Sequence, residues 1–405
     1  MTAQRLLKFM ACLAQRPLWT LSALVPRRPD LWVFGAWRGR AYSDNPKYLY
    51  EHVRRHRPAI QAVWITRSRA LCASLRGASV NAHFHLSPAG LYYQLRAGAV
   101  FFTHTLEGDF LGAAVGRGAY TCQLWHGTPL KRILWDDPEH KASEESAFRR
   151  AATRLFPWLR NRWSLVVAPS RPVARLLAGA FRETPVAVTG YPRTDGIVAG
   201  TVSAAPRPIR RAIYMPTFRG SACTAGSDEA IDGLFEASGF DVERLDATCD
   251  RLGLELVIRL HPSNRPKAAL RERIDRARRI RFDTEADFYA AINAYDALIT
   301  DYSSVFYDFL LTGKPVIHAG FDAWHYMQDT RSLYRPYDEI CLTPGLADWA
   351  GVMAILERFA REGPGAEYVQ RYRRLAEWAN APFDAPCSEN VARHVEARLT
   401  RHAAS

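Results

Sequence analysis

The chain has 405 residues, and its 48% hydrophobic and 23% charged residues indicate a folded globular protein rather than a disordered or disulfide-stapled one. At about 150 residues per domain, this length predicts two or three domains. The 54 Lys and Arg residues against 41 Asp and Glu give a net charge of +13, which favours an anionic partner because guanidinium groups bind phosphate and carboxylate. The seven cysteines have no metal-ligand spacing, so we expect reduced thiols in a cytosolic protein.

Residues 1–29 form a basic amphipathic segment, in which apolar side chains such as Phe9 are interleaved with basic ones such as Lys8. Arg16 and Pro17 interrupt the apolar run, so the segment does not cross a bilayer. A signal peptide is disfavoured because no small-residue cleavage site follows. Two interpretations remain equally weighted: a helix that lies on a membrane surface, and a helix that caps the core.

From residue 30 onward, short apolar runs alternate with segments that can be helical, which predicts parallel sheets with crossover helices. The first series of expected strands is Leu31–Phe34, Ala62–Ile65, Ala99–Phe102, Thr121–Trp125, Leu165–Ala168 and Val186–Val188. The second series is Ala212–Met215, Leu256–Leu260, Ile280–Phe282, Ala297–Ile299 and Pro315–His318. We therefore predict two α/β units.

Gly196–Arg211 separates the two series and is rich in Gly, Pro, Ala and Ser, as expected of a linker. After Gly345 the pattern becomes helical, and the expected helices are Trp349–Arg361, Tyr368–Trp378 and one near Asn390–Arg401. In a two-lobed α/β protein we expect such a C-terminal tail to pack back on the first lobe.

Polar and basic side chains follow five of the expected strands, where open parallel sheets bind their ligands. His126 follows a strand, and Lys131 lies five residues later, which suits abstraction of a hydroxyl proton; a core histidine beside a turn is the alternative. His261 ends a strand of the second series, so two imidazoles could meet one substrate, or both could be structural. Arg193 could hold phosphate or could pair with Asp195 and stiffen the hinge.

Two further segments have groups that can bind phosphate. Thr217 and Arg219 are two residues apart, so on an extended segment they share one face and can reach one phosphoryl group; a surface turn is the alternative. Asp301 or Ser303 can cap an apolar helix continuing over Phe306–Leu311, whose first N–H groups could hold an anion. The sequence contains no P-loop and no clear metal motif, so we expect neither a metal nor another cofactor.

Taken together, these motifs resemble the CDP-glycerol glycerophosphotransferase family of teichoic-acid primases and polymerases and related capsule polymerases. The most specific matching segments are Trp125–Lys131, Tyr191–Asp195, Pro216–Arg219, Arg259–Pro262 and Thr300–Ser304, and the match extends from Gly39–Lys47 to Tyr337-Asp338-Glu339 and Pro344-Gly345. The resemblance implies a GT-B fold of two Rossmann-like lobes with a cleft between them. Residues 30–200 would form the acceptor lobe, 208–375 the CDP-donor lobe, and 376–405 a helical tail.

The resemblance also implies roles for individual residues. His126 would be the base on the acceptor hydroxyl, and His261 would contact the donor phosphates. The diphosphate and the transferred phosphoryl group would be bound by Lys131, Arg193, Thr217, Arg219, Ser303 and Ser304. Gly127, Thr128 and Asp301 belong to the same substrate-binding set, and Asp283 would lie near the cytidine or ribose. The acceptor hydroxyl would attack the β-phosphorus in line and CMP would leave.

The implied donor is CDP-glycerol, with CDP-ribitol as an alternative, and the implied acceptor is lipid-linked or an oligosaccharide. The protein would be monotopic on the cytoplasmic face of an anionic membrane, with Phe148–Trp163 as a second membrane contact or else a solvated helix face. A GT-B glycosyltransferase that uses a nucleotide sugar is the nearest rival. A polyanion- or membrane-binding protein with an inactive transferase fold is the rival from another class, and the lack of a nucleic-acid motif disfavours a nucleic-acid partner.

Overall fold

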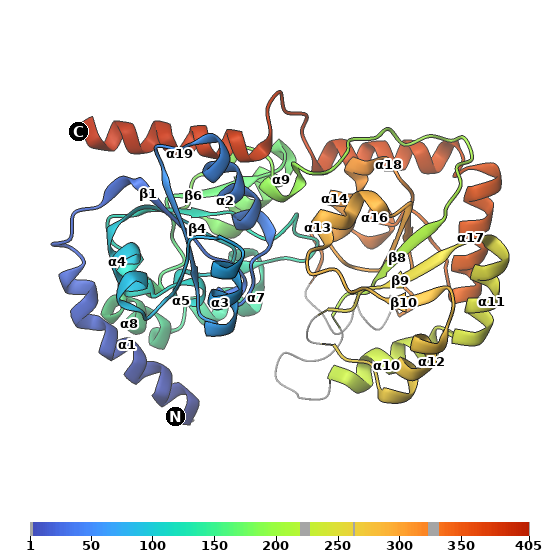
Figure 1. Ribbon diagram of the computed structural model, residues 1–405, viewed down its shortest axis with the longest axis horizontal. Helices are drawn as coiled ribbons and strands as arrows, with labels where there is room; N and C mark the ends of the chain where they lie inside the picture. The colour runs from blue at the N-terminus through green and yellow to red at the C-terminus, as the bar shows by residue number, and fades with distance from the viewer. Residues whose placement is uncertain (1–2, 219–226, 262–263, 323–331, 405) are drawn as a thin grey trace. The chain divides into compact units, whose positions relative to one another are not determined.

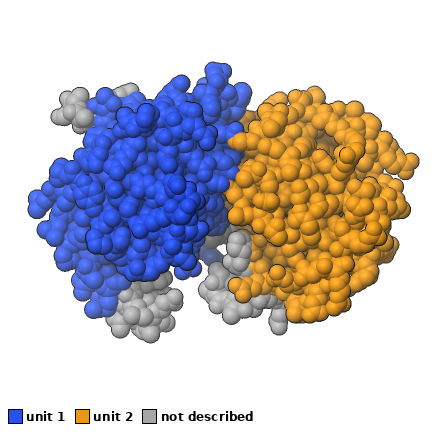
Figure 2. All heavy atoms as spheres, viewed as in Figure 1, with its two compact units in different colours: residues 1–127, 133–195, 381–405 blue, residues 128–132, 196–380 orange. Residues whose placement is uncertain are grey.

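The computed structural model describes residues 3–218, 227–261, 264–322 and 332–404, with the backbone alone at 3–8, 227–230 and 401–404. The chain divides into two compact units, which Figure 2 colours separately. Unit 1 contains residues 1–127, 133–195 and 381–405, and unit 2 contains residues 128–132 and 196–380. Both ends of the chain therefore belong to unit 1.

The described part of unit 1 is built on a seven-stranded sheet in which every pairing is parallel, in the order β3-β2-β1-β4-β5-β6-β7. The strands are β1 Arg28–Phe34, β2 Gln61–Thr66, β3 Ala82–Phe84, β4 Ala97–Phe102, β5 Tyr120–Gln123, β6 Leu165–Ala168 and β7 Val186–Val188. The strand β3 was not expected, because the polar His83 interrupts its apolar residues. The expected strand Thr121–Trp125 is wrong at its end, since Trp125 has a φ of 54° and cannot continue a strand.

Helices cover this sheet and one of them comes from the C-terminus. They are α1 Ala3–Leu21, α2 Asp44–His56, α3 Arg69–Gly77, α4 Pro88–Arg96, α5 Leu106–Asp109, α6 Gly112–Val115, α7 Pro138–Glu144, α8 Ala147–Leu155, α9 Arg171–Phe181 and α19 Cys387–Ala404, with 3-10 turns η1 Trp37–Gly39, η2 Leu134–Asp136, η3 Pro157–Leu159 and η4 Pro192–Thr194. Val391 and Val395 of α19 are buried in the same core as Trp32 and Trp64. The expectation that the C-terminal tail packs back on the first lobe is confirmed for α19.

The described part of unit 2 holds a five-stranded parallel sheet in the order β10-β9-β8-β11-β12. Its strands are β8 Arg211–Met215, β9 Glu255–Ile258, β10 Ile280–Phe282, β11 Ala297–Thr300 and β12 Val316–His318. Its helices are α10 Ser227–Ala237, α11 Val242–Leu252, α12 Ala268–Arg276, α13 Phe288–Ala291, α14 Val305–Phe309, α16 Tyr337–Ile340, α17 Trp349–Glu362 and α18 Ala366–Ala379, with 3-10 turns η5 Ile292–Ala294 and η6 Leu310–Thr312. The helices α17 and α18 belong to this unit rather than to unit 1.

In each sheet the first strand of the unit is an interior strand, and the strand order reverses beside it. β1 pairs with β2 on one side and with β4 on the other, and β8 pairs with β9 and β11 in the same way. Open α/β sheets bind ligands at this reversal, outside the carboxyl ends of the strands. The loops that follow β1, β4, β8 and β11 are therefore the first places to look for a site.

The N-terminal helix α1 packs on unit 1 through aromatic contacts. The rings of Phe9 and Phe156 are 5.6 Å apart, and those of Trp19 and Trp158 are 5.4 Å apart. Figure 1 shows α1 beside α8 in the blue-to-green part of the chain. Within the described ranges, no helix is both long and apolar enough to span a membrane.

Candidate active site

In unit 1, His126 stands just after β5 with its ring orientation fixed. Its Nδ1 lies 3.2 Å from the carbonyl oxygen of Thr103, at the end of the neighbouring β4. Because a carbonyl only accepts hydrogen bonds, Nδ1 carries the proton and Nε2 is left as the basic nitrogen. Burial lowers the pKa of His126 below its ordinary value of 6.5. The half-buried ring is therefore neutral at pH 7, which is the form that a general base requires.

The backbone around His126 is strained and is held by Asn45. Trp125 has a φ of 54° and Gly127 a φ of 127°, a region in which a residue without a Cβ is favoured. The buried Asn45 donates through Nδ2 to the carbonyls of Leu124 and Trp125, at 3.0 and 3.1 Å. Left-handed backbone at a bulky residue is costly and persists only where the surroundings enforce it. The Asn45 hydrogen bonds provide that enforcement.

Arg193 forms a buried ion pair with Asp44, in which both side chains are only 4% exposed. The distance from Arg193 Nη1 to Asp44 Oδ1 is 2.9 Å, and the Arg193 N–H donates to Asn45 Oδ1 at 3.1 Å. The alternative in which Arg193 pairs with Asp195 is wrong, since the Asp195 carboxylate accepts instead from the N–H groups of Cys387 and Ser388. Whether Arg193 also binds phosphate stays a prediction.

In unit 2, Asp301 joins the ends of the two central strands. Its Oδ1 accepts from the Thr217 N–H at 2.8 Å, from Thr217 Oγ1 at 2.5 Å and from the Tyr302 N–H at 2.6 Å. Thr217 follows β8 and Asp301 follows β11, so this cluster lies where the strand order reverses. Two expected site residues are thus brought together at the position that α/β sheets use for ligands.

The segment after β11 differs from the expected helix cap. The helix α14 begins at Val305 and has only five residues before η6, and its N-cap residue is Ser304, whose side chain makes no capping hydrogen bond. Ser303 Oγ accepts from the Val305 N–H at 3.5 Å, whereas Asp301 is engaged with Thr217. Capping by Asp301 is therefore wrong. The anion-binding role of Ser303 and Ser304 stays a prediction.

His261 lies three residues beyond the end of β9 and packs on an aromatic ring. The centroids of the His261 and Phe218 rings are 5.2 Å apart, and Phe218 itself follows β8. Burial lowers the pKa of His261, so this imidazole is also neutral at pH 7. The structure thus places His261 at the same edge of the sheet as Thr217.

The Asp283 carboxylate is occupied by Arg259. Arg259 Nη1 lies 2.5 Å from Asp283 Oδ2 and also donates to the Glu285 carbonyl at 2.7 Å. These residues follow the neighbouring strands β9 and β10. Contact of Asp283 with cytidine or ribose is untested.

The segment 128–132 belongs to unit 2 and pairs with residues 332–334. Lys131 forms an antiparallel bridge with Leu333, and the N–H of Arg132 donates to the Ser332 carbonyl at 2.8 Å. Thr128 is fully buried. The expected motif is therefore divided, because Gly127 belongs to unit 1 and Thr128 to unit 2. Arg219 lies outside the described residues.

A family model described as CDP-Glycerol:Poly(glycerophosphate) glycerophosphotransferase matches residues 18–397. The chain belongs to this family. It is 26% identical over 350 residues to the teichoic acid glycerol-phosphate transferase of Staphylococcus aureus, covering 80% of this chain and 83% of that protein. It is 25% identical to the teichoic acid poly(glycerol phosphate) polymerase of Bacillus subtilis, of which it spans 43%. The structure of the wall teichoic acid polymerase TagF aligns with a TM-score of 0.66 at 18% identity, over 98% of this chain and 97% of the other.

The comparisons confirm two of the expectations drawn from the sequence. The family inferred from the motifs is correct, so the chain is a transferase of the glycerophosphotransferase family. The two parallel sheets and the alignment with TagF confirm the GT-B class with two Rossmann-like lobes. The residues to which the motifs assign roles remain predictions.

Four residues of unit 1 that contact His126 or support the loops around it were not predicted from the sequence: Asp44, which pairs with Arg193; Asn45; His104, whose ring stacks on that of His126; and Asp109, which accepts from the backbone N–H groups of Thr103 and His104. His104 was detectable, because it follows β4 as His126 follows β5. Asp44 and Asn45 lie in the matching segment Gly39–Lys47, but nothing in the sequence indicates their partners. Asp109, which is fully buried, gave no signal at all. In the part of the chain that the structure describes, no group of three or more His, Cys, Asp or Glu residues could hold a metal ion.

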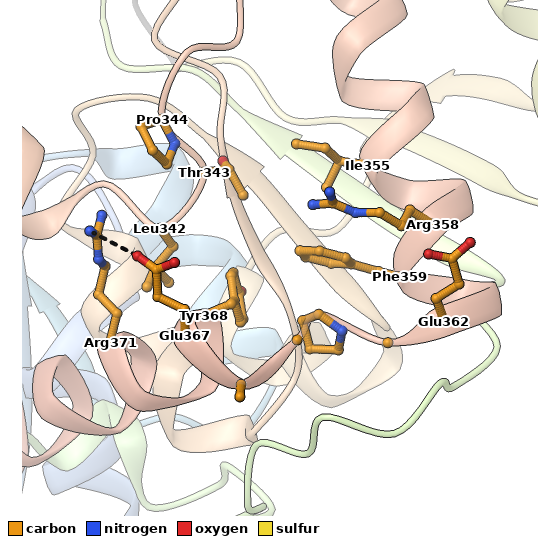
Figure 3. Close-up of a pocket in the computed structure, with 14 residues that line it drawn as sticks. Leu342, Thr343, Pro344, Ile355, Arg358, Phe359, Glu362, Glu367, Tyr368 and Arg371 are labelled. Atoms are coloured by element: carbon orange, nitrogen blue, oxygen red, sulfur yellow. Dashed lines mark ion pairs between the residues drawn. The ribbon is translucent and has the colours of Figure 1, made fainter.

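Unit 2 also contains a cavity of about 560 Å³ that is lined by residues other than those described above (Figure 3). It is bounded by α17, α18 and the segment 342–344, and the side chains of Arg371 and Glu367 form an ion pair at its rim. Tyr368 Oη binds the backbone of Val316 in the edge strand β12. None of the expected site residues lines this cavity, so we do not assign the transfer reaction to it.

Proposed function

We propose that this protein transfers glycerol phosphate from CDP-glycerol to a hydroxyl group of a lipid-linked or oligosaccharide acceptor, with release of CMP, in the synthesis of a teichoic-acid-like or capsule polymer. The observation that carries this proposal is the state of His126 in a chain of this family. Its Nδ1–H is hydrogen-bonded to the Thr103 carbonyl, the imidazole is neutral, and the unprotonated Nε2 can accept a proton. The S. aureus and B. subtilis relatives are glycerol-phosphate enzymes, which favours glycerol over ribitol.

In the proposed reaction the acceptor hydroxyl oxygen bonds to the β-phosphorus of the donor while its proton passes to His126 Nε2. The bond between the β-phosphorus and the bridging oxygen breaks, and CMP leaves with that oxygen. Such phosphoryl transfer depends mainly on positioning and on neutralising the charge of the phosphates. We assign donor binding to unit 2, where Thr217 and His261 lie at the carboxyl edge of the sheet beside Asp301.

The proposal also includes peripheral attachment to the cytoplasmic face of a membrane through α1 and α8. Phe9 and Met10 of α1 are 40% and 53% exposed, and Phe148 of α8 is 70% exposed. Arg150 and Arg154 are exposed on α8 as well. Apolar side chains beside arginines fit an anionic lipid surface, because the rings can enter the interface while the guanidinium groups bind headgroup phosphates.

A donor panel tests the transfer. The full-length protein is incubated with an oligosaccharide or lipid-linked acceptor and with CDP-glycerol, CDP-ribitol or a UDP- or GDP-sugar, and the released nucleotide is measured. We expect CMP from CDP-glycerol. Removal of a general base typically costs about 10²- to 10⁴-fold in rate, which we expect for His126→Ala; His261→Ala should also abolish turnover.

The variant His83→Ala is the matched control, because His83 is a half-buried histidine of unit 1 that packs on Tyr93 at the edge strand β3. It should keep the wild-type rate. Faster turnover of CDP-ribitol would replace glycerol by ribitol in the proposal. Release of UDP or GDP in place of CMP, or wild-type rates in both histidine variants, would overturn it.

A further inference from the structure

A second imidazole lies against His126 in unit 1. The rings of His104 and His126 are nearly parallel, with an interplanar angle of 14° and centroids 4.9 Å apart. The Trp37 ring lies near both imidazoles, with its centroid 5.1 Å from that of His104 and 6.3 Å from that of His126, and the Trp125 ring lies 4.1 Å from His126. One face of the His126 ring is thus covered by the ring of His104, which is itself half-buried.

One residue, Thr103, fixes both imidazoles. Its carbonyl oxygen contacts His126 Nδ1 at 3.2 Å, and its hydroxyl lies 2.9 Å from His104 Nδ1. The Trp37 N–H donates to the same hydroxyl at 3.1 Å. The hydroxyl therefore cannot rotate freely, and the His104 ring is held at a defined angle against its neighbour.

The loop that carries Thr103 and His104 is anchored from two sides. Asp109 Oδ2 accepts from the backbone N–H groups of Thr103 and His104, at 3.2 and 3.0 Å. The side chain of Gln123 donates to the His104 carbonyl at 2.7 Å and accepts from the Trp125 N–H at 2.9 Å. Gln123 thereby links the loop after β4 to the loop that bears His126.

We propose that His104 is a positioning residue for His126: its ring holds the His126 imidazole in the orientation for proton transfer and shields it from water. This inference rests on the proposed function for its effect on rate, but its effect on His126 can be measured without any substrate. The chemistry needs no further reactant, because the proton still moves only from the acceptor hydroxyl to His126 Nε2.

Charged groups near His104 and His126 also affect the pKa values of the two imidazoles. Asp44 acts to raise the pKa of His126 and Arg193 to lower it, although burial is the largest effect and lowers it. Burial also lowers the pKa of His104. The charges of His126 and Arg38 lower the His104 pKa further, whereas those of Asp109 and Asp44 raise it. Burial is the largest effect on both imidazoles and lowers the pKa of each, so both rings are neutral at pH 7 and His104 acts on His126 there as a neutral cover.

The variants His104→Ala and His104→Phe distinguish the effect of an aromatic ring at position 104 from the effect of the imidazole nitrogen atoms. His104→Ala removes the cover, so the pKa of His126 should rise toward 6.5 in an NMR titration of labelled histidines, with the signal assigned through His126→Gln. His104→Phe keeps an aromatic ring of similar breadth and should leave the pKa near its wild-type value. His83→Ala is the control and should leave it unchanged.

With CDP-glycerol and acceptor, His104→Ala should lower kcat by about 10- to 100-fold because a misplaced base loses its alignment. The KM for CDP-glycerol should change less than threefold, and His104→Phe should recover most of the rate. An unchanged His126 pKa in His104→Ala, or equal losses of kcat in both variants, would overturn the inference. If the wild-type protein shows no transfer from any donor, the proposed function fails, while the NMR result still decides the role of His104.

Discussion

Replacement of Asp44 by Asn tests the buried ion pair that supports the His126 loop. The Asp44 carboxylate accepts from Arg193 Nη1 at 2.9 Å, from the Asn45 N–H at 2.8 Å and from Trp37 Nε1 at 3.2 Å. An amide keeps one accepting oxygen, but its NH₂ group would face a donor, and the Arg193 guanidinium would lose its counter-charge while only 4% exposed. Breaking such a buried pair typically costs about 3–5 kcal/mol.

The substitution leaves the backbone free of new strain. Asp44 has a φ of 64°, and Asn tolerates this left-handed region about as well as Asp. The measured loss therefore reports the contacts of the Asp44 carboxylate, of which the ion pair with Arg193 is the charged one. Because domains are stable by only about 5–15 kcal/mol, we expect Asp44→Asn to remove a large fraction of the stability of unit 1.

Hydrogen exchange of the β1 and β4 amides measures this loss in unit 1 itself. If global opening governs their exchange, a loss of about 3–5 kcal/mol should raise the rates roughly 10²- to 4 × 10³-fold. The control Glu183→Gln removes an acid from the exposed pair with Arg162, whose side chains are 74% and 68% exposed, and should cost less than about 1 kcal/mol. The double variant of Asp44→Asn with Arg193→Met should lose less than the sum of the two single variants. An Asp44→Asn loss no larger than that of the control would refute this reasoning.

Two further predictions concern the membrane surface and acid stability. The full-length protein should sediment with anionic vesicles more than with neutral ones. Phe148→Glu should weaken that binding, whereas the control Leu86→Glu, at a side chain that is 53% exposed, should not. Equal binding by both variants would contradict the membrane contact. Burial lowers the pKa of His318 to about 3 and that of His85 to about 4 from 6.5, so the unfolded chain binds more protons below pH 6.5 and stability should fall as the pH drops from 6.5 toward 4. His318→Asn should flatten this decline in thermal unfolding curves, and a slope identical to wild type would contradict the prediction.

Much of the fold was predictable because buried parallel strands are continuous apolar runs. Leu165–Ala168, Val186–Val188 and Ile280–Phe282 were predicted with the bounds that the structure shows. The end of β5 was not, since the left-handed φ of Trp125 is enforced by Asn45, a partner distant in sequence. Patterns of hydrophobicity do not report such long-range hydrogen bonds.

The candidate site was predictable in its residues more than in its contacts. Strand ends carrying His126, Thr217 and Asp301 were visible in the sequence, and the structure brings Thr217 and Asp301 together. The partner of Arg193 was not visible, because Asp44 is 149 residues away while Asp195 is close in sequence. The stacked ring of His104 depends on the pairing of β4 with β5, which only the sheet order reveals.

Mass analysis of a defined acceptor after incubation with CDP-glycerol tests the central claim most directly, because phosphoryl and glycosyl transfer add different groups. We predict that the wild-type protein adds glycerol phosphate units and releases one CMP for each, and that His126→Ala adds none. Transfer of a sugar in place of glycerol phosphate, or undiminished glycerol phosphate transfer by His126→Ala, would contradict the account.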